Sequence, residues 1–177
     1  MRELEAKLSQ RIAAPDATAQ RPSILLIGIG NYLMGDEGIG VQFIQWLAEN
    51  NIQLPDTDIL DGGVGGFTLM GHFDAYDKVI FVDATMDQKP LGTVSLIKPR
   101  FSSDFPKGLT AHDFGLKDMV ESMYLLGRVP ELYLFTISIE EIQPMTVALS
   151  PEVENSIPVL AKEIGQLIQQ LAIPKMV

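Results

Sequence analysis

The 177-residue sequence contains no cysteine, and this absence excludes a broad class of structures and sites. Disulfide bonds, thiolate metal ligands and cysteine nucleophiles all need the thiol group. Histidine is scarce as well, since only His72 and His112 occur, in separate segments. The paired histidines of a zinc-protease helix are therefore missing. No G-x-S-x-G motif occurs either, which argues against the serine nucleophile of an α/β-hydrolase.

The sequence also lacks a long hydrophobic run and an excess of positive charge. No run approaches the roughly 18 apolar residues that a membrane-spanning helix needs, and the first residues contain no signal-peptide core. The 13 basic residues are outnumbered by 23 acidic ones, which gives a formal net charge of −10. Such a charge repels nucleic acids and anionic membranes. We therefore expect a monomeric cytoplasmic protein that binds neither.

The length is that of one domain with a sizeable hydrophobic core. Residues 1–23 combine a short helical spacing of apolar residues with a stretch rich in alanine, proline and small polar residues. Such a composition is typical of an extension or linker. We therefore divide the chain into an N-terminal extension, residues 1–23, and a single domain, residues 24–177.

Strand and helix patterns alternate along that domain. Apolar runs predict buried strands, an alternating run predicts an edge strand at 92–98, and apolar residues at helical spacing predict the intervening helices. The predicted buried strands are 24–27, 57–60, 78–82 and 131–139; the helices begin near 39, 67, 114 and 151. This order predicts an α/β fold, namely a three-layer α/β/α sandwich with a mostly parallel twisted sheet of about five strands. We expect the edge strand to be antiparallel.

The sequence of the last predicted helix indicates where it begins and where it is interrupted. Ser150 is placed to cap its first turn, and Pro151 suits the first helical position. Pro158 falls inside the apolar pattern, which predicts a kink or a later start at that point.

The chain is organised around residues 24–47, which follow the order strand, glycine turn, acidic pair, helix. Gly28 and Gly30 resemble half of a dinucleotide-binding fingerprint, but Leu33 stands where the third glycine is required. Asp36 and Glu37 at the start of the helix would also repel a pyrophosphate. The acidic pair therefore indicates a metal or a proton transfer, and the glycines need only turn the chain.

Ionisable side chains follow several of the predicted strands. Glu37 follows the first strand, Asp61 the second and Asp83 the third, while His112 lies in a loop that could return to the same edge. In open parallel sheets, ligands bind outside the carboxyl ends of the strands. Two carboxylates and an imidazole can hold a divalent transition metal, so we take Glu37, Asp83 and His112 as candidate ligands. Taken singly, Asp83 could cap a turn and His112 could bond a backbone carbonyl.

Two further candidates have open roles. Asp36 could act as an acid or base, because neighbouring carboxylates push their pKa values apart, or it could cap the helix. Asp61, Gly62 and Gly63 could bind an extended peptide through exposed backbone groups, or form a simple tight turn.

Five ordered motifs resemble those of the nickel–iron hydrogenase maturation endopeptidases. They are GIGNYLMGDEGIGV (28–41), DGGVGG (61–66), VDAT (82–85), AHDFGL (111–116) and LSPEV (149–153). The resemblance implies an aspartyl-type endopeptidase that removes a C-terminal peptide from the hydrogenase large-subunit precursor after nickel insertion. It also implies that Glu37, Asp83 and His112 contact the metal, the same three residues that the sheet-edge argument selects.

The resemblance leaves the chemistry open. The nickel, brought by the precursor, could serve only as a recognition element, with Asp36 or another carboxylate activating water. Alternatively, the nickel could assist hydrolysis directly. A non-catalytic nickel-binding chaperone that checks the metal loading of the precursor would use the same ligands, and a nucleotide-binding regulator is a third hypothesis.

Overall fold

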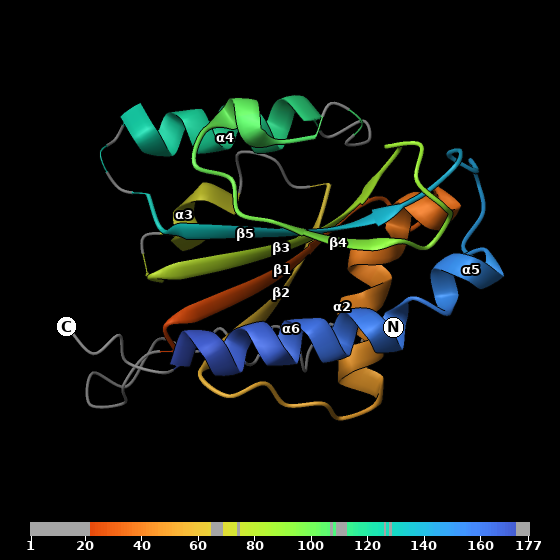
Figure 1. Cartoon of the computed structure of the whole chain (residues 1–177), viewed down its shortest axis with the longest axis horizontal. Helices are drawn as coiled ribbons and strands as arrows, with labels where there is room; N and C mark the ends of the chain where they lie inside the picture. The colour runs from red at the N-terminus through yellow and green to blue at the C-terminus, as the bar shows by residue number, and fades with distance from the viewer. Residues whose placement is uncertain are drawn as a thin grey trace.

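The computed structural model describes residues 22–64, 69–73, 75–106, 108, 113–125, 127 and 129–172 (Figure 1). Its centre is a five-stranded sheet in the order β2-β1-β3-β5-β4. The strands are β1 Ile24–Ile29, β2 Thr57–Gly63, β3 Lys78–Thr85, β4 Val94–Ile97 and β5 Glu131–Ser138. All neighbouring pairs are parallel except β4 with β5, which is antiparallel.

Helices cover both faces of the sheet (Figure 1). The described ones are η1 Gly35–Gly38, α2 Ile39–Glu49, α3 Met70–Phe73, η3 Ser102–Asp104, α4 Asp113–Leu125, α5 Pro151–Glu154 and α6 Ile157–Ala172. One core cluster joins α2 and α6 to the sheet, and a second joins α3 and α4 to its opposite face. The predicted three-layer α/β/α sandwich with an antiparallel edge strand is therefore confirmed.

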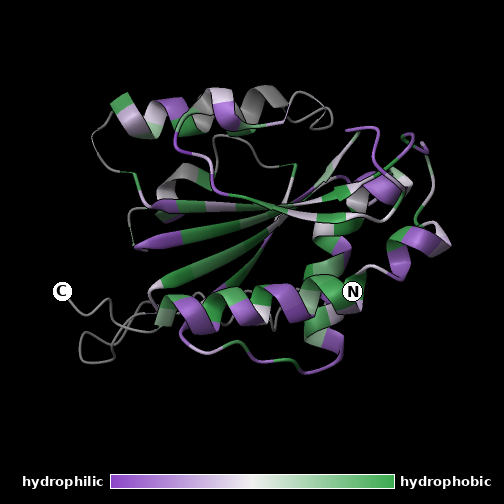
Figure 2. Ribbon diagram, in the orientation of Figure 1, coloured by the Kyte–Doolittle hydropathy of each residue, from purple (hydrophilic) through white to green (hydrophobic). Residues whose placement is uncertain are grey.

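The apolar strands explain why the sheet is central. The side chains of β1 are buried along its whole length, and those of β3 are buried after Lys78. Strands covered on both faces are expected to be apolar on both, and Figure 2 shows hydrophobic strands between helices that carry polar outer surfaces. The predicted strands occur at the expected places, but β1, β2 and β3 extend further toward their carboxyl ends than the sequence indicated, and the edge strand predicted at 92–98 covers only Val94–Ile97. The helices predicted to begin near 39, 114 and 151 are confirmed, whereas the start predicted near 67 lies outside the described residues.

The last helical region is divided into α5 and α6 around Asn155 and Ser156. Pro158 is the second residue of α6, so the predicted later start is confirmed. Ser150 does occupy the cap position of α5, but its side chain makes no capping hydrogen bond. The predicted capping contact of the hydroxyl is therefore wrong, and the backbone N–H of Ser150 has a different partner, described below.

Most of the proposed N-terminal extension lies outside the described residues. Of it, Pro22 and Ser23 are described, and the Ser23 carbonyl oxygen accepts hydrogen bonds from the backbone N–H groups of Asp77 and Lys78. Among the described helices, none has the length and apolar character needed to cross a membrane.

Candidate active site

The carboxyl ends of three neighbouring strands meet at one edge of the sheet. Gly28 of β1 is paired with Asp61 of β2 on one side and with Val82 of β3 on the other. The chain therefore leaves β1, β2 and β3 at nearly the same level. This register brings the predicted acidic residues to a common edge, where open α/β sheets bind their ligands.

Two glycines let helix α2 begin directly against that edge. A Cβ on Gly28 would lie 2.0 Å from the carbonyl oxygen of Gly40, and a Cβ on Gly40 would lie 2.2 Å from that of Ile29. Only glycine permits such a close approach of one backbone to another. The contact holds the turn η1, which precedes α2 and packs against β3, over the end of the sheet.

Glu37 and Asp83 are both buried at this edge, with 2% and 1% of their surfaces exposed. The backbone N–H of Asn31 donates to Oε2 of Glu37 at 2.7 Å, and the N–H of Ala84 donates to Oδ1 of Asp83 at 2.8 Å. Carboxylates are rarely buried this deeply unless hydrogen bonds, a positive charge or a metal ion compensates. Glu37 comes from η1 and Asp83 from β3, the two elements that pack together.

The face of the sheet on which each acid lies follows from the alternation of side chains along a strand. Val79 and Phe81 belong to the core on the α3 and α4 side, so Asp83 faces that side as well. Ile59 belongs to the opposite core, so Asp61 faces the α2 and α6 side. The sheet edge therefore carries Asp83 and Asp61 on different faces.

His112 lies outside the described residues. The loop that leads to it approaches the end of β3, because the N–H of Met86 donates to the carbonyl oxygen of Gly108 at 2.6 Å. Helix α4 begins at Asp113 on the face to which Asp83 points. Within the described ranges, no group of three histidine or acidic residues is close enough to hold a metal. The three-ligand hypothesis thus stays a prediction, with Glu37 and Asp83 placed in neighbouring elements.

Asp36 is buried and its carboxylate has two hydrogen-bond partners. Ser150 donates its backbone N–H to Oδ1 at 2.6 Å, and Gln143 donates Nε2 to Oδ2 at 3.1 Å. The N–H of Asp36 in turn donates to Oε1 of Gln143 at 2.9 Å. Asp36 therefore binds the segment 143–150 to η1, beside the hydrogen bond from Gly35 N–H to the Thr146 carbonyl oxygen. Its predicted part as an acid or base stays a prediction.

The Asp61 segment is less enclosed. Desolvation by its neighbours raises the pKa of the Asp61 carboxyl above the ordinary 3.8, and the N–H of Gly63, which donates to Oδ1 at 3.0 Å, opposes that rise. A Cβ on Gly62 would meet Ile27 Cγ2 at 2.7 Å, whereas a Cβ on Gly63 would have no described neighbour closer than 4.0 Å. Gly63 has φ of 49°, and no atom in the described part of the chain is in close contact with the position that a side chain would take there.

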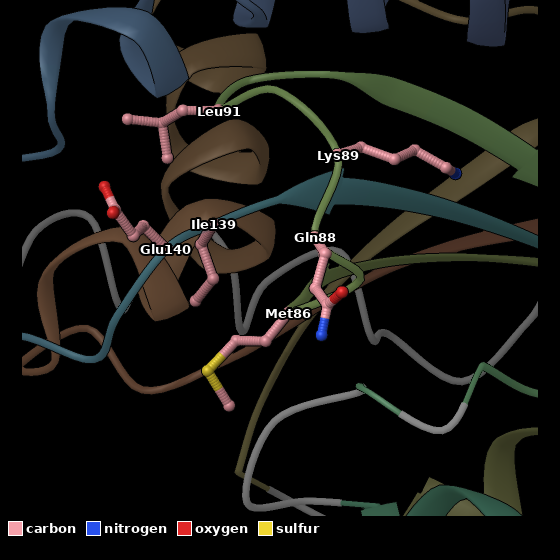
Figure 3. A pocket seen from close by; sticks show the side chains of 6 residues that line it. All are labelled: Met86, Gln88, Lys89, Leu91, Ile139 and Glu140. Atoms are coloured by element: carbon pink, nitrogen blue, oxygen red, sulfur yellow. The ribbon is translucent and has the colours of Figure 1, made fainter.

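A hollow of about 420 Å³ opens beside the same edge (Figure 3). It is lined by Met86, Gln88, Lys89, Leu91, Ile139 and Glu140. Met86 follows β3 and Ile139 follows β5, so the hollow begins where these strands end. In Figure 3 the Lys89 side chain extends away from Ile139 and Glu140, consistent with its ion pair with Asp87 at 2.8 Å.

The profile of the hydrogenase maturation proteases matches residues 41–167 of the chain. The chain belongs to the hydrogenase maturation protease family. The protein is therefore a peptidase, as the resemblance implied. Membership in a family of proteases favours this activity over a non-catalytic nickel chaperone and over a nucleotide-binding regulator.

Similar proteins and structures agree with this family. The hydrogenase 2 maturation protease of Escherichia coli strain K12 is 34% identical over 149 residues, which cover 81% of this chain and 90% of that protein. The solved structure of the E. coli hydrogenase maturating endopeptidase HybD has a TM-score of 0.74 and 28% identity, covering 84% of this chain and 93% of that one. The [NiFe] hydrogenase maturation protease HybD of Thermococcus kodakarensis has a TM-score of 0.64 and 25% identity, covering 85% and 99%.

Sequence reasoning missed the residues that hold the turn η1 of this maturation protease in place. Asn31 and Ser150 fall inside the motifs at 28–41 and 149–153, but neither motif predicts their contacts with Glu37 and Asp36. Gln143 lies in no motif and is 107 positions from its partner Asp36. The hollow also went unpredicted, because it forms between two loops that follow different strands. Neither loop has a spacing pattern that would bring it to the other.

Proposed function

We propose that this protease removes the C-terminal extension of a nickel-loaded [NiFe] hydrogenase large-subunit precursor. The observation that supports this most strongly is the pair of deeply buried carboxylates, Glu37 and Asp83, at the carboxyl edge of a hydrogenase maturation protease fold. The similar T. kodakarensis protein is a [NiFe] hydrogenase maturation protease, which supports the choice of the hydrogenase class. The precursor is the partner, and its nickel arrives as part of the substrate.

In this proposal Glu37, Asp83 and His112 contact the nickel of the precursor. Carboxylate oxygens and an imidazole nitrogen suit a divalent transition metal, and three protein ligands leave positions for the ligands that the precursor supplies. Asn31 fixes one oxygen of Glu37, and Ala84 fixes one oxygen of Asp83, so these side chains have little rotational freedom. Preset ligands of this kind recognise a metal at low entropic cost.

The extended tail of the precursor lies, in the same proposal, along the backbone of the segment Asp61, Gly62 and Gly63. Gly63 projects no side chain into the adjacent space. A tail held there would present its peptide bond to a water molecule next to the metal-binding side chains. Bound nickel supplies either a fixed point of recognition or polarisation of the reacting carbonyl.

Mass spectrometry of the nickel-loaded precursor, before and after incubation with the protease, tests the proposal. Wild type is expected to remove a C-terminal peptide, and Glu37→Ala, Asp83→Ala and His112→Ala are each expected to abolish the cleavage. Glu37→Gln and Asp83→Asn test the same groups with the volume preserved. His72→Ala is the matched control, because this exposed histidine of α3 lies outside the proposed site. Unchanged precursor mass with wild type, or normal processing by all three alanine variants, would refute the proposal.

The role of nickel is tested with a second metal. Precursors loaded with nickel or with zinc are compared for kcat and KM. A recognition role predicts that the exchange changes KM, whereas direct polarisation of the scissile carbonyl predicts a change in kcat.

A further inference from the structure

Asp36 and Gln143 form a reciprocal pair of hydrogen bonds at the turn that carries Glu37. The N–H of Asp36 donates to Oε1 of Gln143 at 2.9 Å, and Nε2 of Gln143 donates to Oδ2 of Asp36 at 3.1 Å. The two contacts fix the orientation of the amide, because an N–H needs an acceptor and a carboxylate needs a donor. The second carboxylate oxygen accepts the N–H of Ser150 at 2.6 Å.

These hydrogen bonds hold the loop of residues 143–150 against the turn η1. Gly35 N–H donates to the Thr146 carbonyl oxygen at 2.7 Å, so residues 143–150 contact the turn at several points. The turn η1 also packs against β3, where Asp83 lies. A Cβ on Gly35 would lie 2.2 Å from Oε1 of Gln143, which shows how closely the amide is seated. The turn is therefore held by contacts with both the loop and the sheet.

We propose that the Asp36–Gln143 pair is a positioning device that holds Glu37 in its working orientation, and that Asp36 does not itself transfer protons. Glu37 is the next residue along the same turn, all four residues of which are buried. A bond network that fixes the turn fixes the direction of the Glu37 side chain, as outer partners do for metal ligands. The proposal rests on the proposed function only where cleavage is the readout.

Exchanging the two functional groups tests this directly. Gln143→Glu places a second carboxylate against Asp36 and removes the donor, so the pair should break. Asp36→Asn with Gln143→Glu restores the complementarity in reverse: the asparagine amide donates to the new glutamate, which still accepts the N–H of residue 36. The double variant has no carboxylate at position 36, so a proton-transfer role for Asp36 predicts that it stays inactive.

The first readout does not depend on cleavage. The N–H of Asn31 donates to Oε2 of Glu37 at 2.7 Å, so its amide hydrogen exchange reports where Glu37 lies. We expect the protection of this amide to fall about 10-fold or more in Gln143→Glu and to return in the double variant. Unchanged protection of the Asn31 amide in Gln143→Glu would overturn the proposal, whatever the substrate of the protease.

The second readout is the rate of precursor cleavage. Gln143→Glu is expected to lower kcat/KM about 10- to 100-fold, the usual cost of losing a partner of a metal ligand, and the double variant is expected to recover most of that loss. A folded double variant as inactive as Gln143→Glu would overturn the proposal in favour of an acid or base at position 36. If wild type does not cleave the precursor, the proposed function fails, and the amide readout still decides the positioning role.

Two further variants serve as a charge-free replacement for Gln143→Glu and as a matched control. Gln143→Leu keeps most of the volume and removes both hydrogen bonds without adding charge, so it replaces Gln143→Glu if the latter does not fold. Gln42→Ala is the matched control, because Nε2 of Gln42 donates to the Val147 carbonyl oxygen at 2.8 Å and thus binds the same loop away from η1. Equal losses of Asn31 protection in Gln42→Ala and Gln143→Leu would contradict a specific effect of the Asp36–Gln143 pair.

Discussion

Gly40 of α2 lies so close to Val82 of β3 that a Cβ on residue 40 would be 2.4 Å from the Val82 carbonyl oxygen. The same Cβ would be 2.2 Å from the carbonyl oxygen of Ile29 in β1. Both obstacles are backbone atoms of central strands, which cannot move without disturbing the sheet. One glycine thus sets the distance between the helix that follows the acidic turn and the strand that carries Asp83.

The first prediction is that Gly40→Ala destabilises the protein by about 3 kcal/mol, the upper part of the usual cost of overpacking. Urea unfolding measures this free energy. Gly165→Ala is the control: it lies within α6 with no described neighbour near the added methyl group, so it should raise the stability by about 0.5–1 kcal/mol. A Gly40→Ala variant as stable as wild type would show that the helix can move away from the sheet.

The second prediction concerns Gly63. Its φ of 49° is accessible to asparagine at small cost, and no described atom lies closer than 4.0 Å to an added Cβ, so Gly63→Asn should change the stability by about 1 kcal/mol at most. If the precursor tail lies there, the added side chain should displace it and slow cleavage about 10-fold or more. Steady-state cleavage and thermal unfolding of the same preparation check both parts. Unchanged cleavage would favour a simple turn.

Much of this site could be predicted from sequence because it depends on local patterns. Apolar runs located the strands, and the rule that ligands bind at carboxyl ends brought Glu37 and Asp83 together without any structure. The partner of Asp36 could not be found in this way. Gln143 lies in a loop whose path is set by tertiary contacts, such as that between Gly35 and Thr146, and not by periodicity. The sequence likewise placed Ser150 at a helix start but not its N–H against Asp36.

The third prediction is a pH dependence from Asp61. The pKa of Asp61 is raised in the folded chain, so the folded state holds its proton more tightly than the unfolded state does. Stability therefore falls as the pH rises from the ordinary pKa of 3.8 to the raised pKa of the folded state, and above that pKa the loss is complete. Asp61→Asn cannot ionise but keeps an oxygen for the Gly63 N–H. The variant should therefore have a higher Tm than wild type at neutral pH, with the difference disappearing below pH 3.8. A Tm difference of the opposite sign at neutral pH would contradict the desolvation of this carboxyl.

The fourth prediction compares the hydroxyl groups of two residues that are paired in neighbouring strands. Thr85 of β3 is paired with Ser138 of β5, and both side chains are fully buried. Thr85 Oγ1 has no hydrogen-bond partner in the described part of the chain, whereas Ser138 Oγ donates to Oδ1 of Asp87 at 2.7 Å. An unpartnered buried hydroxyl is a net cost, and a bond to a charged acceptor is a gain.

Thr85→Val preserves the shape of the side chain and removes the unpartnered hydroxyl, so it should raise the free energy of unfolding by about 1 kcal/mol. Ser138→Ala removes a bonded hydroxyl at the same level of the sheet and should lower it by about 1.5 kcal/mol. Urea unfolding of both variants provides the comparison. Destabilisation by Thr85→Val would contradict the prediction, because it would mean that the Thr85 hydroxyl forms a hydrogen bond in solution, for example to a bound water molecule.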